Sequence, residues 1–521
     1  MTVLAIFPPI YWSLAVLFLY YIWDLVVTKR LIWAQKEHPV VGSPSWWTPR
    51  AILNLIFATK ASRLLEEGYQ KFKNGTFQLI RANGNIVILP LSALEELSQL
   101  PPTLASPNGA LEHDLVGEYS GVNVISQSRI HHTIVQRKLT PRLPLLTPAL
   151  QDELEIAITD TFPASSRNQI EDWTEIKPFH LMGQLVARLS ARALVGSEFC
   201  RDPVWLDISL SFTQCLFTTV IVLRTFPTWT YSVLSRCLPS YWRGRAYLRK
   251  AQTVLGPAIQ NLLKHHDEGT FTAQPTDSVM AWMIEGAKGI DRDAEMLTRS
   301  EVLLSLASVH TILIRLTNTL YDLAAHPTYI EELCAEIQDQ KEKWTTDPMA
   351  AYSNLHKLDS VLRESQRLAP GTTLGLKRLL RESYRFTSIS PPITVKKGTI
   401  VALPVMAIEN DPAYIDEPGR YDPLRTYRRG MGPRTTSQWS NQHSYTAIDR
   451  TVLGFGYGKS ACPGRFFASL VLKMVLVKLL TEFDFRLVPG TSRPRSYEVH
   501  EFLFMAPWEK LQIRRRCYTK A

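Results

Sequence analysis

The sequence lacks the features that divide a long chain into separate modules. Its 521 residues contain no Gly/Ser-rich linker, no low-complexity stretch and no repeat of solenoid period. Such features accompany flexibly joined domains and repeat proteins, so neither organisation is expected. Length alone permits two or three domains. One large globular domain with a short N-terminal appendage is the simpler interpretation, and a hydrophobic content of 45% supports a large core.

Cysteine is scarce and lacks the spacing of metal sites. None of the six cysteines belongs to a CxxC pair; they are Cys200, Cys215, Cys237, Cys334, Cys462 and Cys517. Zinc needs about four N or S ligands at short spacing, and an iron–sulfur cluster fails on the same count. The cytosolic exposure inferred below would keep these thiols reduced, so disulfides are not expected either.

Positive charge is in excess, but no nucleic-acid-binding motif accompanies it. The formal net charge is +10, and the Lys and Arg residues are dispersed along the chain. Nucleic-acid binding is therefore not expected. A basic face toward anionic lipid, or toward an acidic protein partner, suits this charge better.

A long hydrophobic run does occur near the N-terminus. Residues 10–27 are apolar except for Ser13 and Asp24, and Lys29 and Arg30 follow directly. About 20 apolar residues cross the hydrocarbon layer, so we predict a single membrane helix with the rest of the chain on the cytosolic side. A cleaved signal peptide is the alternative. The anchor is favoured because the cations follow the run and no small-residue cleavage site is evident.

The remaining residues predict a mostly α-helical fold with minor β-sheet. Two short apolar runs around Asn83-Gly84-Asn85 predict a β-hairpin at 76–90, and helical periodicity dominates from about 110 to 340. Later elements are expected to be a helix at 354–368, strands at 383–403, a Gly/Ser/Arg-rich loop at 426–450 and an apolar helix that begins at 463.

The longest predicted helix covers residues 301–327. Thr298 and Glu301 have the spacing of a capping box at its start, and His326-Pro327 ends it. About 26 residues at about 1.5 Å rise would extend ~40 Å, which implies a large helical domain. Four polar or charged side chains argue against a second membrane span; they are His310, Arg315, Asn318 and Asp322.

One cysteine lies in an unusual context, FGYGKSACPGR at 455–465. Pro463 suits the first turn of a helix, so Cys462 is expected at a helix N-terminus, where unpaired amides and the helix dipole favour a thiolate. Three glycines in the stretch leave room for a flat, bulky group to approach the backbone. The pattern is that of a thiolate offered to a large ligand. A buried structural cysteine is the alternative, and a catalytic nucleophile would need a base that the sequence does not identify.

The stretch resembles the haem-binding signature F-G-x-G-x-x-x-C-x-G of the cytochrome P-450 monooxygenases. Three further motifs stand in the family's order: Glu364-Ser365-Gln366-Arg367 as E-x-x-R, Tyr421–Arg425 as the P-x-R segment, and Ala307–Thr311 in place of A-G-x-D/E-T. The resemblance covers roughly residues 35–515. It implies the cytochrome P-450 fold, with a long central helix, a small β-rich subdomain, an N-terminal membrane anchor at 1–30 and a catalytic domain at 31–521.

The resemblance also implies roles for residues of the site. Cys462 is then the fifth ligand of the iron of haem b, and its electron donation favours O–O cleavage. Phe455 belongs to the same cofactor-binding set. Thr311 would organise the protons that oxygen must receive. His310 stands where the family has an acid, and either it relays protons itself or it is a neutral core histidine and water on Thr311 takes that role.

The haem propionates need cationic or hydrogen-bonding partners. Arg378 is the candidate that follows the 354–368 helix, while His132 and Arg137 occupy the region of the family's helix C, without its usual W-x-x-x-R. Arg137 has a plain alternative as an exposed cation on a helix. Ser460 takes a position where the family usually has Arg or His, which weakens one expected propionate contact.

The family's substrate-contacting segments are largely apolar in this chain, which indicates a lipophilic substrate in a cavity with few polar anchors. Core packing is the alternative for each residue by itself; the set is Phe212, Leu216, Phe217, Val220, Leu304, Leu374, Phe502 and Phe504. Residues 186–205 and the form of the Cys462 motif resemble filamentous-fungal members that oxidise terpenoids. A terpenoid, meroterpenoid or indole-diterpene intermediate of secondary metabolism is therefore the expected substrate.

The leading hypothesis is a monooxygenase anchored in the endoplasmic reticulum membrane. It would receive the electrons of NADPH from an NADPH–cytochrome reductase docked on a basic face. A haem-thiolate isomerase or dehydratase, which needs neither oxygen nor a reductase, is the alternative, and the presence of Thr311 counts against it. A non-catalytic haem- or lipid-binding protein would require neither Thr311 nor an access channel.

Overall fold

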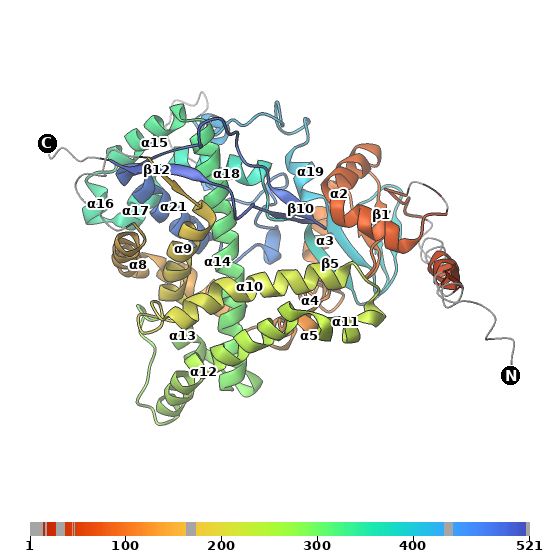
Figure 1. Cartoon of the computed structure of the whole chain (residues 1–521), viewed down its shortest axis with the longest axis horizontal. Helices are drawn as coiled ribbons and strands as arrows, with labels where there is room; N and C mark the ends of the chain where they lie inside the picture. The colour runs from red at the N-terminus through yellow and green to blue at the C-terminus, as the bar shows by residue number, and fades with distance from the viewer. Residues whose placement is uncertain are drawn as a thin grey trace.

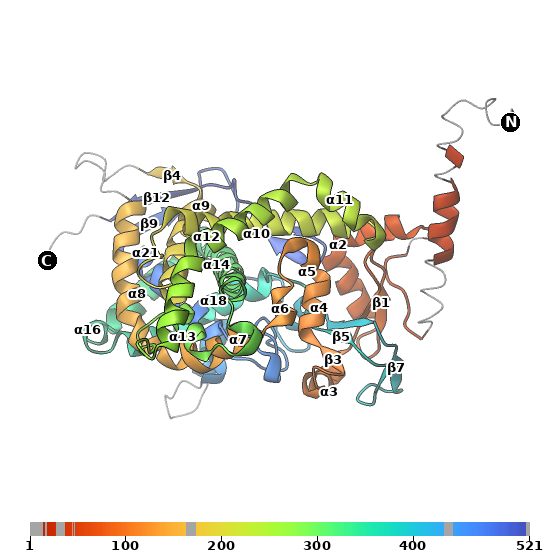
Figure 2. The same cartoon turned by 90° about the horizontal axis from the view of Figure 1, so that it is seen from below.

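The computed structural model describes residues 14–15, 18–27, 37–43, 45, 47–162, 173–431 and 441–516. Within these residues, α-helices form most of the protein and four small β-sheets accompany them, as predicted. Figures 1 and 2 show the long helices gathered on one side and the largest sheet toward the opposite end, near the N-terminal helix. That helix, Phe18–Val27, is the described part of the predicted anchor; residues 10–13 and 16–17 of the prediction lie outside the described residues.

The long predicted helix lies at the centre of the molecule. It is α14 (Ala294–Ala325), and it starts earlier than predicted because Asp293 caps it by accepting a hydrogen bond from a first-turn amide. The predicted capping box is wrong: Thr298 lies inside the helix with a buried, unpartnered hydroxyl, and Glu301 is fully buried. The helix ends before His326, as predicted.

α14 packs against helices from distant parts of the chain. They are α9 (Pro178–Leu194), α10 (Pro203–Arg224), α12 (Pro239–Asp267), α18 (His356–Leu368) and α21 (Arg465–Glu482). α8 (Thr140–Thr161) packs on the outer side of α9. The apolar stripes of these helices meet in one hydrophobic core, so α14 is buried on nearly every face.

Further helices complete the helical part. They are α2 (Arg50–Lys71), α3 (Leu94–Gln99), α4 (Pro107–Asp114), α5 (Gly117–Ser120), α6 (Val124–Gln127), α7 (Ile130–Ile134), α11 (Tyr231–Cys237), α13 (Val279–Gly286), α15 (Thr328–Asp339), α16 (Lys343–Thr346), α17 (Pro348–Ser353), α19 (Val405–Glu409) and α20 (Arg425–Gly430). The helix predicted at 354–368 is confirmed as α18. The loop predicted at 426–450 begins with α20, and residues 432–440 of it lie outside the described residues.

The largest sheet has the strand order β1-β2-β8-β5-β3. Its strands are β1 (Phe77–Leu79), β2 (Ile86–Ile88), β3 (Ala105–Ser106), β5 (Gly375–Leu380) and β8 (Ile400–Leu403). The predicted hairpin is confirmed, because β1 and β2 pair antiparallel with Phe77 opposite Ile88. The smaller sheets are β4 (Thr174–Ile176) with β12 (Leu511–Arg515) and β9 (Phe483–Arg486), β10 (Tyr497–Val499) with β11 (Phe502–Phe504), and β6 (Tyr384–Phe386) with β7 (Ile393–Val395).

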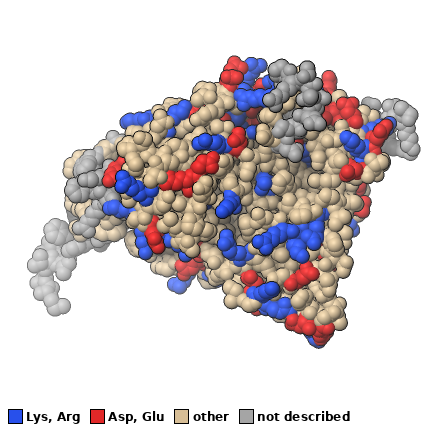
Figure 3. Space-filling view, turned by 180° about the vertical axis from the view of Figure 1, so that it is seen from behind, with Lys and Arg blue, Asp and Glu red and all other residues tan. Residues whose placement is uncertain are grey.

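Two helices of the described chain, α10 and α14, are long and apolar enough to cross a membrane by composition. The most apolar window of α14 is 72% buried inside the protein, as a core helix would be, and that of α10 is 44% buried. The surface carries mixed charge: on the face in Figure 3, groups of Lys and Arg lie among Asp and Glu. The positive excess therefore does not form one continuous patch on this face.

Candidate functional site

The segment from Phe455 to Cys462 folds back on itself. The Cys462 amide donates to the Phe455 carbonyl at 2.7 Å, and a short 3₁₀ turn, Gly458–Ser460, lies between them. Gly456 has a φ of +77°, and a Cβ at this position would lie 3.0 Å from the Ser460 carbonyl oxygen. Any other residue at Gly456 would therefore strain the loop, so this glycine of the motif is explained by the backbone.

Cys462 lies just before the N-terminus of α21, which begins at Arg465 rather than at the predicted Pro463. Burial raises the pKa of the Cys462 thiol, and it outweighs the lowering by the Gly464 and Arg465 amides and by the Arg465 charge. The helix terminus alone therefore does not produce the predicted thiolate. By accessible area the side chain is nevertheless exposed. Both observations fit a sulfur enclosed by protein on most sides and open on one, where a metal ion would bind it as the thiolate.

In the middle of α14, one stripe is accessible although most of the surrounding helix is buried. It consists of Leu304, Ala307, Ser308 and Thr311, which recur at the three- and four-residue spacing of one helix face. The Thr311 hydroxyl donates to the Ala307 carbonyl at 2.7 Å, which leaves the lone pairs of its oxygen free to accept a hydrogen bond. The predicted Thr311 is thus presented to a ligand rather than packed in the core.

His310 points elsewhere. It is 9% exposed, and within the described residues neither ring nitrogen has a hydrogen-bond partner. Burial lowers the pKa of His310 to about 4, so the ring is neutral at pH 7. The structure therefore favours the neutral core histidine over the proton relay.

Arg378 lies on β5 and is 3% exposed. Its Nη2 donates to the Ser460 hydroxyl at 2.7 Å and its Nη1 to the Lys377 carbonyl at 2.9 Å. Burial lowers the pKa of Arg378 to about 10, and no carboxylate of the described chain forms an ion pair with it. A buried guanidinium beside the Cys462 loop, without its own anion, is the donor that a haem propionate requires, so these residues fit haem. Ser460, at a position the family usually fills with a cation, is explained as a partner of Arg378.

The other two propionate candidates lie next to α8. His132 is part of α7 and half-buried, and burial lowers its pKa; Arg137 is exposed on a π-helical turn, Val135–Leu139. Within the described residues, neither side chain hydrogen-bonds to the Cys462 loop. The contact between this region and the loop comes instead from Thr140, whose hydroxyl donates to the Pro463 carbonyl at 3.3 Å.

The E-x-x-R motif forms a buried charge network, as the resemblance implied. Arg367 Nη2 lies 2.7 Å from Glu364 Oε1 and its Nε lies 3.0 Å from Oε2, while Arg425 Nε lies 3.5 Å from Oε1. The Asp422 amide also donates to Glu364 at 3.1 Å.

A cavity of about 220 Å³ borders this network of Glu364, Arg367 and Arg425. Its lining is mainly charged and polar, which does not suit a lipophilic substrate.

The residues predicted to contact substrate divide into two groups. Phe212, Leu216, Val220 and Leu374 are at most 2% exposed and belong to the core. The others are partly accessible; they are Leu304, Phe217, Phe502 and Phe504. The rings of Phe502 and Phe504 both meet Phe217 edge to face, with centroids 5.5 and 5.4 Å away. This aromatic cluster is the part of the prediction that presents an accessible apolar surface.

A second buried charge network, which the sequence did not indicate, lies beside these rings. Arg81 Nη1 pairs with Asp114 at 3.0 Å, Lys377 Nζ pairs with Asp114 at 2.6 Å and also with Glu501, and Arg224 Nη2 pairs with Glu501 at 2.8 Å. Lys377 and Arg224 also lie over the Phe502 ring, at 5.5 and 5.7 Å from its centroid. Charged side chains therefore lie next to the Phe502 ring, and the expectation of few polar anchors in the substrate cavity stays a prediction.

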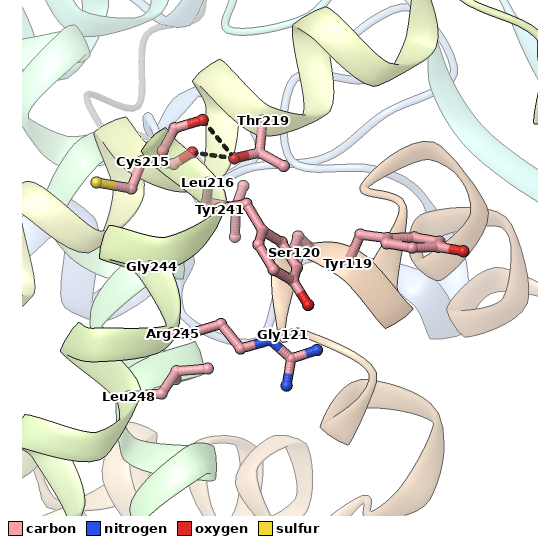
Figure 4. A pocket seen from close by; sticks show the side chains of 11 residues that line it. Tyr119, Ser120, Gly121, Cys215, Leu216, Thr219, Tyr241, Gly244, Arg245 and Leu248 are labelled. Atoms are coloured by element: carbon pink, nitrogen blue, oxygen red, sulfur yellow. Dashed lines mark hydrogen bonds between the residues drawn. The ribbon is translucent and has the colours of Figure 1, made fainter. Parts of the chain in front are cut away.

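A small cavity lies between α5, α10 and α12 (Figure 4). The Thr219 hydroxyl donates to the Cys215 carbonyl at 2.9 Å and its oxygen lies 2.8 Å from the Ser240 hydroxyl, which can donate to it, and the side chains of Tyr241 and Arg245 lie beside them. Its volume of about 10 Å³ has room for about one water molecule, so it is not a substrate site.

Comparison with known proteins agrees with this geometry. The family model described as cytochrome P-450 matches residues 126–513. A cytochrome P-450 monooxygenase of Emericella nidulans is 34% identical over 484 residues, which cover 92% of this chain and 88% of that protein. An ent-kaurene oxidase of Gibberella intermedia is 30% identical over 507 residues, covering 97% and 93%. The cytochrome P-450 monooxygenase AtmP of Aspergillus flavus is 31% identical over 490 residues, covering 93% and 90%. By these matches the chain belongs to the cytochrome P-450 family, whose members are haem-thiolate oxidoreductases supplied with electrons from NAD(P)H through a reductase.

Proposed function

We propose that this protein is a membrane-bound monooxygenase that inserts one atom of O2 into a lipophilic substrate, with Cys462 as the ligand of the haem iron. The observation that carries the proposal is the Cys462 loop, which fixes the sulfur at the start of α21 and leaves one side of it open. Arg378, oriented by Ser460, is the proposed propionate partner. The loop backbone at Phe455 completes the cofactor site, with 1–30 as the anchor and 31–521 as the catalytic domain.

Haem supplies the binding and reductive activation of O2. The chain's own residues supply position and protons. Thr311 accepts a hydrogen bond on its free lone pairs and so holds a water or a protonated ligand over the accessible stripe of α14. His310, buried and neutral, keeps the helix packed rather than carrying protons.

A terpenoid-type hydrocarbon is the proposed substrate class. The accessible aromatic cluster of Phe217, Phe502 and Phe504 offers apolar contact area, and one relative is named an ent-kaurene oxidase. Co-expression with a reductase, feeding of a panel of terpenoid scaffolds and mass analysis of the products tests this proposal. Conversion of polar, non-terpenoid compounds alone would contradict it.

Attachment to the endoplasmic reticulum membrane is proposed from the apolar N-terminal helix. Tyr21 of this helix donates to the Trp47 carbonyl, and Asp24 accepts from the Ala51 amide at the start of α2, which joins the helix to the folded part. The helices α2 and α11 lie at the same end of the molecule as the N-terminal helix (Figures 1 and 2). Large apolar side chains are exposed on or next to them. They include Ile52, Leu55, Trp229 and Val233. Deletion of residues 1–30 should lower the fraction of the protein that sediments with microsomes. If the deletion variant sediments with carbonate-washed microsomes as fully as the full-length protein does, the anchor is contradicted.

The haem ligand is tested by carbon monoxide binding. The reduced protein should show the Soret band of a thiolate-ligated CO complex, and Cys462→Ala should abolish it. Cys237→Ala, at another exposed cysteine, is the matched control and should keep the band. Absence of the band in the unaltered protein would end the proposal.

The type of reaction is tested by turnover. A monooxygenase requires O2, NADPH and a reductase, so product formed at full rate without them would favour the isomerase or dehydratase instead. Thr311→Ala should consume NADPH with little product, because the proton-organising hydroxyl is lost, while Thr311→Ser should retain coupling. Equal coupling in both variants would contradict the role of Thr311.

A further inference from the structure

The second buried charge network holds more positive than negative charge. Arg81, Lys377 and Arg224 meet Asp114 and Glu501 in four ion pairs of 2.5–3.0 Å, and all five side chains are at most 15% exposed. Within the described residues, no other carboxylate pairs with the three cations, so one positive charge is in excess. Burial of a positive charge is unfavourable unless an anion offsets it. The network is therefore suited to accept one further negative charge.

Two guanidinium groups of this network also have unused hydrogen-bond donors. Arg81 donates to Asp114 and to the Gly84 carbonyl, and Arg224 donates to Glu501. Arg81 Nη2, Arg224 Nε and Arg224 Nη1 are buried and have no partner among the described residues. A water molecule would satisfy such donors without offsetting the charge. A carboxylate does both, because its two oxygens accept hydrogen bonds and carry the negative charge.

Two of the cations lie against the accessible aromatic cluster. Lys377 Nζ and Arg224 Cζ lie over the Phe502 ring, 5.5 and 5.7 Å from its centroid, and Phe502 meets Phe217 edge to face. Both rings are partly accessible, and Lys377 is the most accessible side chain of the network at 15% exposed. Apolar contact area and unused cationic donors therefore adjoin at Phe502. This combination suits a ligand with an apolar body and an acidic group.

Backbone hydrogen bonds hold the parts of this site together. The Thr373 amide donates to the Glu501 carbonyl at 2.8 Å, which fixes the β10–β11 turn against the segment that leads into β5. The Asn54 side chain donates to the Arg224 carbonyl at 3.0 Å and accepts from the Ala82 amide at 2.9 Å. It thereby joins the end of α10 to the β1–β2 hairpin. A ligand that binds between fixed elements loses little affinity to ordering of the protein.

We propose that the second network recognises a carboxylate group of the substrate, while the hydrocarbon skeleton of the same molecule lies on the rings of Phe217 and Phe502. This inference rests on the proposed function and narrows its substrate class to an amphipathic terpenoid acid. The carboxylate accepts hydrogen bonds from Lys377 and from the unused donors of Arg224, and it offsets the excess charge. These residues select and orient the substrate and take no part in oxygen activation.

The first test compares matched ligands on the unaltered, haem-loaded protein. The probes are three terpenoid acids of increasing size, farnesoic, abietic and ursolic acid, each paired with its uncharged methyl ester. At neutral pH at least one acid should bind about tenfold more tightly than its ester, because hydrogen bonds to a charged group are strong. Affinity is measured by equilibrium dialysis and by the shift of the haem Soret band. If no acid binds, or if every ester binds as tightly as its acid, the inference is overturned.

The second test locates the acid preference in the network. Lys377→Gln removes one cation and should lose most of the tenfold preference while the ester binds as before, whereas Lys377→Arg keeps a cation and should keep the preference. Lys478→Gln is the matched control. Lys478 is 17% exposed and also lies between two carboxylates, Glu155 and Glu482, so its loss has a similar structural cost. This control should keep the preference for the acid.

The outcomes separate this inference from the proposed function. An acid preference that is undiminished in Lys377→Gln, or lost equally in Lys478→Gln, overturns the assignment to the second network. Equal affinities for acid and ester in a protein that shows the thiolate band of the CO complex overturn this inference alone. Absence of that band overturns the proposed function itself.

Discussion

The two buried charge networks differ in how far apart their members lie in the sequence. Glu364 and Arg367 are separated by three residues on α18 and share one helix face. In the other network, Lys377 and Asp114 are 263 residues apart, and Arg224 and Glu501 are 277 apart. The residues of the first network are close enough in the sequence to form a recognisable motif. Those of the second network meet only when the largest sheet, α4, α10 and the β10–β11 turn pack together.

The networks also differ in how their donors are satisfied, although each holds one more cation than carboxylate. Glu364 is shared by two arginines, and backbone carbonyls such as that of Pro418 satisfy further donors of Arg367. The second network holds Arg81, Lys377 and Arg224 against two carboxylates, and three guanidinium nitrogens of Arg81 and Arg224 have no partner within the described residues. Among these residues the first network therefore leaves one such nitrogen, Arg425 Nε, without a hydrogen-bond partner, and the second leaves three.

Loss of Glu364 should have the largest effect. Glu364→Ala leaves Arg367 and Arg425 buried without their anion and should lower the free energy of unfolding by about 3–5 kcal/mol. Glu417→Ala is the matched control, since Glu417 and Arg420 form the same i,i+3 pair on the surface, and it should leave the stability unchanged. The measurement is urea unfolding followed by fluorescence. Equal losses in both variants would show that burial does not separate the two pairs.

Loss of Glu501 should have a smaller but pH-dependent effect. Burial raises the pKa of the Glu501 carboxyl, but Arg224 and Lys377 outweigh burial and bring it to about 2, below the ordinary value of 4.5. Its contribution is therefore complete above pH 4.5 and is lost as the pH falls toward 2. Glu501→Gln keeps a hydrogen-bond acceptor and should cost about 2–4 kcal/mol at neutral pH.

The control for Glu501 is Glu498→Gln on the same hairpin. Glu498 accepts from the Ser62 amide at 3.0 Å and from the Ser62 hydroxyl, so it has neutral partners and should lose less stability. The gap between Glu501→Gln and the unaltered protein should close between pH 4.5 and 2. A constant gap over that range would mean that Glu501 is not stabilised as the carboxylate.

The smallest effect is expected from a change at Ser460, the partner of Arg378. Both Arg378 of the proposed haem site and Lys377 of the second network lie on β5. Ser460→Ala removes the hydroxyl that orients Arg378 and should cost about 1 kcal/mol, measured as a severalfold faster transfer of haem to an acceptor protein. Ser460→Thr retains the hydroxyl and should retain haem. Equal rates in Ser460→Ala and the unaltered protein would exclude an orienting role for Ser460.

Much of the fold follows from short-range patterns. The β1–β2 hairpin, α18, α21 and the end of α14 were all predicted, because turn residues, helix breakers and apolar periodicity act over a few residues. The start of α14 was not, because Asp293 offers a cap five residues before the predicted cap Thr298 and tertiary burial then accommodates Thr298 and Glu301. The sequence offers two possible caps for this helix, and tertiary packing determines which of them starts it.

The candidate site follows the same division. Cys462 and Thr311 were named from motifs and Arg378 from its place after the 354–368 helix. The structure places them in an open loop, on an accessible stripe and in a buried donor position. The orientation of His310 away from the stripe was not predictable, because a one-residue step on a helix turns a side chain by about 100° and only the packing around α14 decides which direction is buried. Four residues predicted to face the substrate proved to be core for the same reason.

The sequence by itself determined the family and the helical class and indicated the residue that we propose as the haem ligand, because each depends on residues a few positions apart whose spacing the backbone enforces. Only the tertiary structure decided the partners of the charges. Arg378 meets Ser460, and Glu501 meets Arg224 and Lys377, across separations that leave no local pattern. The physical reason is that a buried charge is satisfied by whichever group folding brings within hydrogen-bond distance, and its position along the chain does not enter.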